Sequence, residues 1–287
     1  MNPIRHMLAA LLLLASLFTA STPARAETFN TCAGFITSLP ATISTQGVWC
    51  LKQDLTTAIT TGNAITIATN NVTIDCNDFK IGGLQAGSSS TTFGIYSNGR
   101  LNATVRRCNI RGFYIGIDLE NGSGHLVEDN RLDQNLSVGI IVAGDNNLVQ
   151  RNRVYDTGGY PGGNFSYGIH ASANVIDNTV AGVFAAATDT FPRGISIFGA
   201  GNEARDNRVQ GLVVAGGGVA YGIHALDAGS RIDGNHIVAA ASTYGYGIYG
   251  QGTNAFCSSN AVINFSTPIL DAYSPSATCP DTSQTFR

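Results

Sequence analysis

Short apolar stretches alternate with polar turns along this chain, and from about residue 54 the pattern repeats every 22 to 29 residues. Folded onto that period, one polar position becomes a column of asparagines, in similar text such as VEDNRL and ARDNRV. The column contains Asn130, Asn152, Asn178, Asn207, Asn235 and Asn260, with Asn77 and Cys108 as earlier members. A buried amide both donates and accepts, so stacked asparagines are expected to bond to one another and to the turn backbone.

A second column, in phase with the first, is a Gly-Ile pair. Its members are Gly94-Ile95, Gly116-Ile117, Gly139-Ile140, Gly168-Ile169, Gly194-Ile195, Gly222-Ile223 and Gly247-Ile248, and Pro268-Ile269 closes the series. Strand alternation predicts that each Ile points inward and the following residue outward. Glycine suits a bend at which a side chain would clash.

Each repeat therefore holds an apolar strand, a turn with Asn, a second strand, a loop and a Gly-Ile strand. One repeat cannot bury its own apolar side, and stacking supplies the missing partner. The pattern predicts an all-β protein, a single-stranded right-handed parallel β-helix of about eight coils with terminal caps. A sandwich or propeller fits less well, because the period is too short for four strands per unit.

The N-terminus has the pattern of an export signal: a basic start at Arg5, an apolar run over 7–18 and an Ala-x-Ala site ending at Ala26. No second apolar stretch is long enough to span a bilayer, so we expect a secreted or periplasmic protein without a membrane span after cleavage. The expected regions are a signal peptide (1–26), an N-terminal cap (27–53), the repeat domain (54–270) and a C-terminal cap or tail (271–287).

Charge and cysteine content narrow the partners and the compartment. The net charge is −3, and loss of Arg5 and Arg25 with the signal would leave −5, which argues against nucleic acid as a partner. The even number of six cysteines in an exported chain predicts disulfides. Nearest-neighbour pairing is preferred among the fifteen connectivities, which gives Cys32–Cys50, Cys76–Cys108 and Cys257–Cys279. No Cys-x-x-Cys spacing occurs, so a zinc site is not expected, and no residue is assigned as a metal ligand.

The segment AITIATNNVTIDCNDFKIGG (64–83) resembles the opening coil of pectate-lyase-like parallel β-helix proteins. Later units resemble the short repeats of the carbohydrate-binding and sugar-hydrolase β-helix group, which includes periplasmic NosD-type proteins. The resemblance covers roughly 54 to 270 and implies a polysaccharide or cell-envelope glycan as partner. It does not fix an activity. The paired-Asp and Arg-x-Lys motifs of polygalacturonase-like hydrolases and the Asp-Pro-His-Asp motif of alginate epimerases are absent from the sequence. No calcium cluster is evident, so calcium remains an open cofactor without an assigned site.

The candidate site follows from the loops and the outward column. Long loops at 156–167, 182–193, 211–221 and 239–246 fall at one point of the coil, where they would build a wall. The outward column reads Tyr96, Asp118, Ile141, His170, Ser196, His224 and Tyr249. The residues before each Gly, which point either outward beside it or inward at the bend, include Phe93, Tyr167, Arg193, Tyr221 and Tyr246.

These residue types suit a sugar chain, because aromatic rings stack on pyranose faces and polar groups bind hydroxyls and carboxylates. The predicted sugar contacts are Tyr96, Tyr167, Ser196, Tyr221, Tyr246 and Tyr249. In a lytic reaction His170 or His224 would take the C5 proton, Arg193 would neutralise the carboxylate and Asp118 would orient a histidine. The alternative for each histidine is an exposed ladder residue without a role.

Acidic and basic residues flank the asparagine column, and we interpret them as a solvated salt-bridge face, with an acidic metal-binding row as the alternative. They are Asp129, Arg151, Asp177 and Asp206 before the column and Arg131, Arg153, Arg208 and His236 after it.

Three hypotheses follow. The first is an exported protein, expected as a monomer, that binds a carbohydrate polymer, with a lyase-like activity as its catalytic form. The alternative is a non-catalytic structural or adhesive envelope protein. A NosD-like metal-delivery role is the weakest, because the chain has two Met and no His or Cys cluster. Whether the protein is an enzyme stays open.

Overall fold

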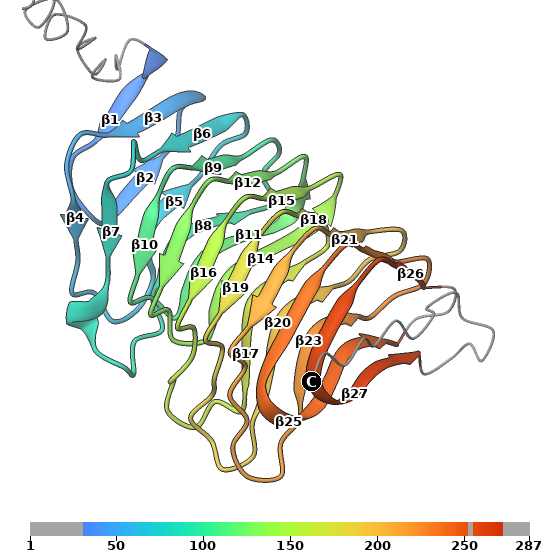
Figure 1. The fold of residues 1–287 in the computed structure, drawn as a ribbon. Coiled ribbons are helices and arrows are strands. Elements are labelled where there is room, and N and C mark those ends of the chain that lie inside the picture. The colour runs from blue at the N-terminus through green and yellow to red at the C-terminus, as the bar shows by residue number, and fades with distance from the viewer. Residues whose placement is uncertain (1–30, 252–254, 272–287) are drawn as a thin grey trace, which may run out of the picture. The chain divides into compact units, whose positions relative to one another are not determined.

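The computed structural model describes residues 31–251 and 255–271. The chain divides into two units, Met1–Thr31 and Cys32–Arg287, and the fold below is that of the second. It is an all-β parallel solenoid of about nine turns (Figure 1). No helix among the described residues has the length and apolar character needed to cross a bilayer. The predicted signal peptide and nearly all of the predicted C-terminal tail lie outside the described residues.

One sheet runs the length of the solenoid and carries the strand before each asparagine turn. This first sheet, in spatial order, consists of β1 (Gly34–Ile36), β3 (Gly47–Leu51), β6 (Val72–Asp75), β9 (Thr104–Arg106), β12 (Leu126–Glu128), β15 (Leu148–Gln150), β18 (Asn174–Ile176), β21 (Glu203–Arg205), β24 (Arg231–Asp233) and β26 (Phe256–Ser258). Every pairing within it is parallel, for example Val127 of β12 with Val149 of β15.

The strand after each turn forms a second face, called here the short-strand face. Its strands are β4 (Leu55–Thr56), β7 (Lys80–Gly82), β10 (Asn109–Arg111), β13 (Arg131–Asp133), β16 (Arg153–Tyr155), β19 (Thr179–Ala181), β22 (Arg208–Gln210) and the starts of β25 (His236–Gly250) and β27 (Ala261–Asp271). A 3-10 turn, η2 (Leu84–Ala86), follows β7.

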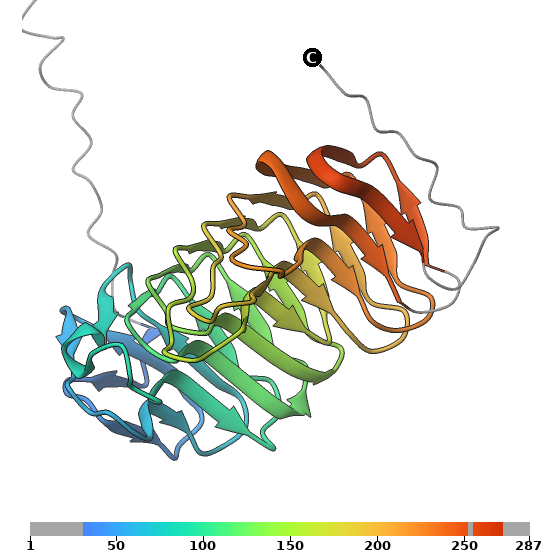
Figure 2. The same cartoon turned by 90° about the horizontal axis from the view of Figure 1, so that it is seen from below.

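The Gly-Ile strands form the third face, called here the Gly-Ile face. Its strands are β2 (Ala41–Ile43), β5 (Asn63–Ile67), β8 (Phe93–Asn98), β11 (Ile115–Ser123), β14 (Val138–Asp145), β17 (Phe165–Ala171), β20 (Phe191–Ile197), β23 (Ala220–Ala225) and the ends of β25 and β27. Figure 2 shows these coils stacked along one axis.

The solenoid has about nine turns, one more than the sequence predicted. The difference lies in the region expected to be the N-terminal cap. There β1 pairs with β3, and β2 pairs with β5, both in parallel, so this region winds on as a coil. Its turns lack the asparagine that marks later repeats, which is why the period did not reveal it.

The glycine of each Gly-Ile pair is required by close packing inside the coil. A Cβ on Gly168 would lie 2.3 Å from Cγ1 of Val180, and one on Gly194 would lie 2.3 Å from Cγ1 of Val209. The following residue, Ile169 or Ile195, is also fully buried. Two consecutive inward positions interrupt the usual alternation, so the residues on either side of the pair both face outward.

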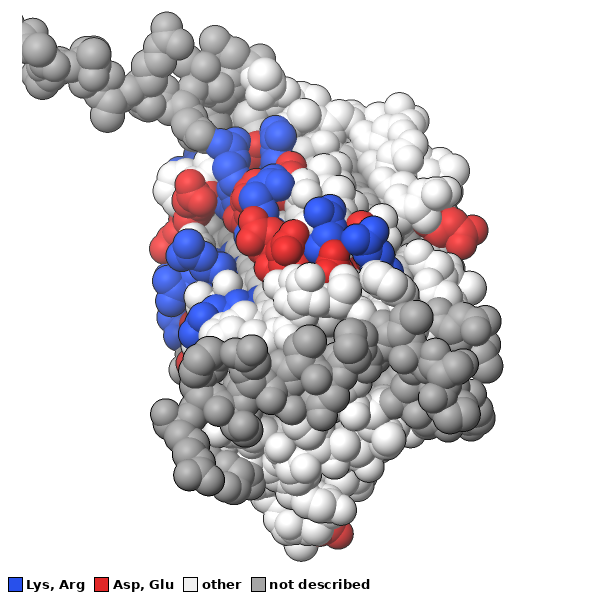
Figure 3. Space-filling model, turned by 45° about the vertical axis from the view of Figure 1, so that its right-hand side comes forward, with Lys and Arg blue, Asp and Glu red and all other residues white. Residues whose placement is uncertain are grey.

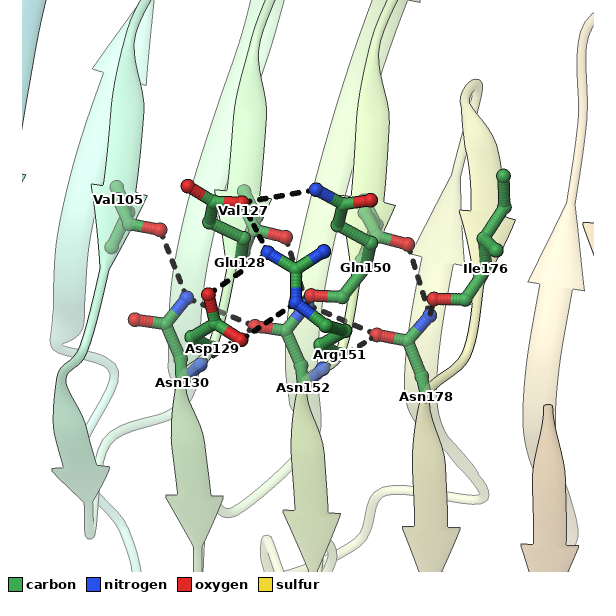
Figure 4. A network of polar contacts seen from close by, with 11 residues as sticks. Val105, Val127, Glu128, Asp129, Asn130, Gln150, Arg151, Asn152, Ile176 and Asn178 are labelled. Atoms are coloured by element: carbon green, nitrogen blue, oxygen red, sulfur yellow. Dashed lines mark hydrogen bonds and ion pairs between the residues drawn. The ribbon is translucent and has the colours of Figure 1, made fainter. Parts of the chain in front are cut away.

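The asparagine column forms a continuous chain of amides (Figure 4). Asn152 shows the pattern: its Nδ2 donates to Oδ1 of Asn178 at 3.0 Å and to the carbonyl of Val127 at 2.8 Å. Its Oδ1 accepts from both the backbone N–H and the Nδ2 of Asn130, at 3.1 and 2.9 Å. The same side-chain bonds continue from Asn178 through Asn207 and Asn235 to Asn260. The predicted ladder is confirmed from Asn130 onward.

At the N-terminal end of the column, a disulfide-bonded cysteine stands in place of an asparagine. Cys108 donates its backbone N–H to Oδ1 of Asn130 at 3.0 Å, and its sulfur is bonded to Cys76 of the previous coil. Asn77, the earliest predicted member, bonds the Leu51 carbonyl at 3.1 Å and accepts from Arg107, so it stands beside the amide chain.

Two of the three predicted disulfides are confirmed, Cys32–Cys50 and Cys76–Cys108. The third predicted pair, Cys257 with Cys279, includes a residue outside the described part of the chain.

Replacing one rung of the ladder is expected to be costly. Asn178→Ala removes three donated bonds and leaves the Asn152 N–H without its acceptor inside the coil. Each buried unsatisfied group costs about 1–3 kcal/mol, so we expect a loss of about 3–5 kcal/mol in the free energy of unfolding, measured by urea denaturation. The exposed Asn174→Ala should cost under about 1 kcal/mol. Equal losses in the two variants would contradict the ladder's role.

Candidate functional site

Two outward columns on the Gly-Ile face hold the predicted site. Strand pairing places His170 on β17, Ser196 on β20 and His224 on β23 in one column, followed by Tyr249 on β25. The residues before each glycine form a parallel column of Tyr167, Arg193, Tyr221 and Tyr246. The open choice for these residues is resolved, because the rings of the two columns touch: the Tyr167 and His170 ring centroids are 4.8 Å apart.

Three of the four predicted long loops lie together beside these strands, at the lower edge of the solenoid in Figure 1. They occupy 156–164, 182–190 and 211–219 and stack on one another, with Phe184 N–H donating to the Thr157 carbonyl and Val213 N–H to the Val183 carbonyl. The fourth prediction, 239–246, is wrong: this stretch lies inside β25, where the pairing with β27 shifts register. The extra residues are taken up by a bulged strand instead of a loop.

Arg193 lies at the centre of the site. Its Nη1 donates to the Tyr167 hydroxyl at 2.6 Å, and its Nε donates to Nδ1 of His224 at 3.1 Å. The guanidinium carbon lies 5.1, 5.0 and 5.1 Å from the ring centroids of Phe165, Tyr167 and Tyr221. Within 31–251 and 255–271, no carboxylate forms an ion pair with it. Arg193 is thus a fixed cation in an aromatic setting.

Towards the C-terminal end, rings from two coils form one aromatic cluster. Tyr221 stacks on His224 with centroids 5.0 Å apart, and Tyr246 and Tyr249 lie 5.6 Å from Tyr221. His224 Nε2 lies 3.2 Å from Oε1 of Gln251. Because Nδ1 of His224 accepts from Arg193, the imidazole proton is on Nε2 and is directed at Gln251.

The electrostatics leave Arg193 as the charged group of this cluster at neutral pH. Burial, reinforced by the Arg193 charge, lowers the pKa of His170 to about 4 and that of His224 to about 4. Burial also raises the pKa of Tyr221. Both imidazoles are therefore neutral at pH 7, and the cluster carries one positive charge.

Three predicted residues do not join the cluster as expected. Asp118 is paired in register with Ile141, which in turn pairs with His170, so a whole coil separates the carboxyl from the histidine it was predicted to orient. Tyr96 pairs with Asp118, one coil further away, and its hydroxyl accepts from Asn98. Ser196 lies between the two histidines, but it is fully buried and its hydroxyl has no hydrogen-bond partner. The repeat register correctly predicted that these residues share a column, but not how many coils separate them or that Ser196 is buried.

Four contributors were not predicted. Phe165 and Phe191 stack on each other with centroids 5.2 Å apart, Phe198 lies 4.6 Å from the His170 ring, and Gln251 contacts His224. All four stand two residues from members of the outward columns. Extending the alternation by one step in each direction would have found them.

The charged row beside the asparagine turns forms the predicted ion pairs only in part: Asp129 pairs with Arg151 and Asp206 with Arg205, whereas Arg131, Arg153 and Asp177 form no ion pair with another described residue. Arg151 bonds Asp129 at 2.8 Å and Glu128 at 2.6 Å (Figure 4), and Arg231 bonds Asp233 at 2.9 Å. Among the described residues, no group of three or more His, Cys, Asp or Glu side chains could hold a metal ion.

A family model described as a right handed beta helix region matches residues 54–209. Comparison with curated proteins finds no match. Among solved structures, the catalytic domain of a GH87 alpha-1,3-glucanase in complex with nigerose is 12% identical over 87% of this chain, with a TM-score of 0.44. This chain spans 61% of the glucanase chain.

An alginate lyase from Paenibacillus sp. str. FPU-7 is 12% identical, covering 83% of this chain and 97% of its own, with a TM-score of 0.39. The A-module of the Azotobacter vinelandii mannuronan C-5 epimerase AlgE4 is 14% identical, covering 82% and 84%, with a TM-score of 0.38. At this level the structural likeness concerns the fold alone.

Asp118 is expected to make stability depend on pH. It is 4% exposed, and burial, with a smaller contribution from Glu120, raises its pKa to about 7. The folded state therefore keeps a proton that the unfolded chain loses near pH 3.8. The contribution of this protonated carboxyl to the free energy of unfolding is complete below that pH and is lost as the pH rises through 7. Asp118→Asn removes the cost of ionising this buried carboxyl. Its free energy of unfolding should therefore exceed that of the parent by almost nothing at pH 4 and by as much as about 4 kcal/mol at pH 8.

Denaturant unfolding at a series of pH values measures this difference. The exposed Asp145→Asn serves as control and should show a small difference at every pH. A pH-independent difference between Asp118→Asn and the parent would contradict the assignment.

Proposed function

This chain belongs to the right-handed β-helix family. We propose that it binds a carbohydrate polymer along the Gly-Ile face, with Arg193 binding the carboxylate of an acidic sugar. The observation that carries the proposal is that Arg193 is held in a fixed orientation without a carboxylate partner among the described residues. Its guanidinium is oriented by Tyr167 and His224. Arginine recognises carboxylates through paired N–H donors, and a preoriented guanidinium loses less entropy on binding.

The surrounding rings suit a sugar chain that runs along the solenoid axis. Parallel coils are about 4.8 Å apart, so β17, β20, β23 and β25 present aromatic groups at regular steps. Phe165, with 43% of its surface exposed, and Tyr244, with 64%, offer apolar area to pyranose faces. The stacked loops beside these strands would hold the chain from one side.

Binding is better supported than catalysis. Nδ1 of His170 is buried without a partner, and Nδ1 of His224 is occupied by Arg193. A pKa of about 4 makes either imidazole a weak base at neutral pH. A lyase would need one of them to take the C5 proton of a uronic acid. We therefore propose carbohydrate binding without lyase activity.

The two disulfides support export to an oxidising compartment, either the periplasm or the medium. A structural or adhesive role in the cell envelope is compatible with the same binding face, since it too needs glycan contact without turnover.

Arg193→Ala is expected to weaken binding of an acidic polysaccharide by about 10- to 100-fold, because a hydrogen-bonded charge pair contributes about 1.5–3 kcal/mol. Affinity gel electrophoresis in polygalacturonate, alginate and a neutral glucan measures this. Arg205→Ala on the first sheet removes the same charge and should bind like the parent. Unchanged binding by Arg193→Ala, or equal retardation by the neutral glucan, would refute the site.

We expect no unsaturated product when the protein is incubated with these acidic polymers and ultraviolet absorbance is followed over time. The reason is that imidazoles with a pKa of about 4 are weak bases, and that Nδ1 is buried in His170 and bonded to Arg193 in His224. Steady product formation that is lost in His170→Ala, with binding retained, would replace the binding proposal by a lyase with His170 as base.

A further inference from the structure

We propose that the short-strand face carries a second, separate binding site for a carboxylated polysaccharide, centred on Arg131 and Arg153. The site lies on β13 and β16, on a different face of the coil from Arg193. Its ligand is a linear polymer that bears carboxylates and free hydroxyls.

Strand register builds the site. A single outward column on this face contains a hydrogen-bond donor on seven successive strands: Lys80, Asn109, Arg131, Arg153, Thr179, Arg208 and His236. The residues that follow them in the chain are buried in the core, for example Leu132 and Val154. These seven positions contain no carboxylate; the first of them, Lys80, is paired with Asp54 of the preceding coil at 3.2 Å. The column therefore presents donors at the coil spacing of about 4.8 Å along the axis.

The two central arginines are adjacent like charges. Arg131 and Arg153 are direct register partners on neighbouring strands, an arrangement that disfavours the folded state. In the described part of the chain neither forms an ion pair, whereas Arg151 beside them bonds Asp129 and Glu128. Arg131 instead lies over the ring of Tyr155, 5.9 Å from its centroid. An anionic ligand would relieve this repulsion.

A groove lies next to the pair. A cavity of about 480 Å³ is bordered on one side by Asn109, Arg131, Arg153 and Thr179 and on the other by Asp78, Asp129, Arg151 and Asp177. Figure 3 shows acidic and basic side chains close together in one region of the face it draws, with largely uncharged described surface to the right of it.

The residues on the two sides of the groove, called here its two rims, determine which class of ligand fits. The arginine rim can bind carboxylates, while Asp177 and Asp129 can accept hydrogen bonds from sugar hydroxyls. Duplex DNA, with one charge per about 1.7 Å, would bring dense negative charge against Asp177. A uronic acid polymer, with one carboxylate per sugar, fits both rims. With Arg193 on another face, one molecule could hold two polymer strands.

The test compares two double variants that lose the same charge. Arg131→Gln/Arg153→Gln alters the column, and Arg205→Gln/Arg231→Gln alters two exposed ion-paired arginines of the first sheet. Both are made in the Arg193→Ala background, so that the first site does not contribute. Polygalacturonate binding is measured by titration at two salt concentrations, with thermal unfolding as the check on folding.

We expect the column variant to lose at least tenfold in affinity and much of the salt dependence, and the control to bind like its Arg193→Ala parent. Equal affinity in the two double variants would overturn the proposal, whether both bind or both fail. Tighter binding of duplex DNA than of polygalacturonate at the same salt would overturn the choice of ligand. If Arg193→Ala alone binds as tightly as the native protein while the column variant loses binding, the second site stands without the first.

Discussion

The structure depends on satisfying the polar groups of a turn that is buried in every coil. In a parallel solenoid such a turn has no hairpin partner, and its backbone groups would remain without hydrogen bonds. The amide of Asn152 resolves this by donating to the next amide and to the previous coil's carbonyl, and by accepting from the backbone N–H of Asn130. The next asparagine does the same. A shift by one residue in any coil between those of Asn130 and Asn260 would break two rungs, so the ladder holds these coils in register.

The register in turn produces both proposed sites. It places Arg193 between Tyr167 and Tyr221 on adjacent coils, where ring contacts and hydrogen bonds orient the guanidinium. By the same rule it places Arg131 beside Arg153. A repeat fold therefore turns a residue type that recurs in the sequence into a stripe along the molecule. One stripe is aromatic with a single cation, and the other is rich in donors.

The sequence was sufficient to predict the fold class, the ladder and the outward columns, because these follow from periodicity and alternation. It did not predict the first coil, whose turns lack the asparagine. The region 239–246 was expected to be a loop, but a bulged strand accommodates its length. Whether Tyr167 faces outward depends on two successive inward positions at Gly168 and Ile169, which simple alternation does not contain. Asp118 failed as a partner for His170 because a shared column does not mean adjacent coils.

The central claim, that the amide ladder holds the coils in register, is tested most directly by hydrogen exchange at single residues. The backbone N–H groups of Asn130, Asn152, Asn178 and Asn207 each donate to the next asparagine. We predict that they exchange only through global unfolding, as slowly as the N–H groups of core strands such as β15. Exchange at the faster rates of the loops at 182–190 and 211–219 would show that the turns open locally and would contradict the account.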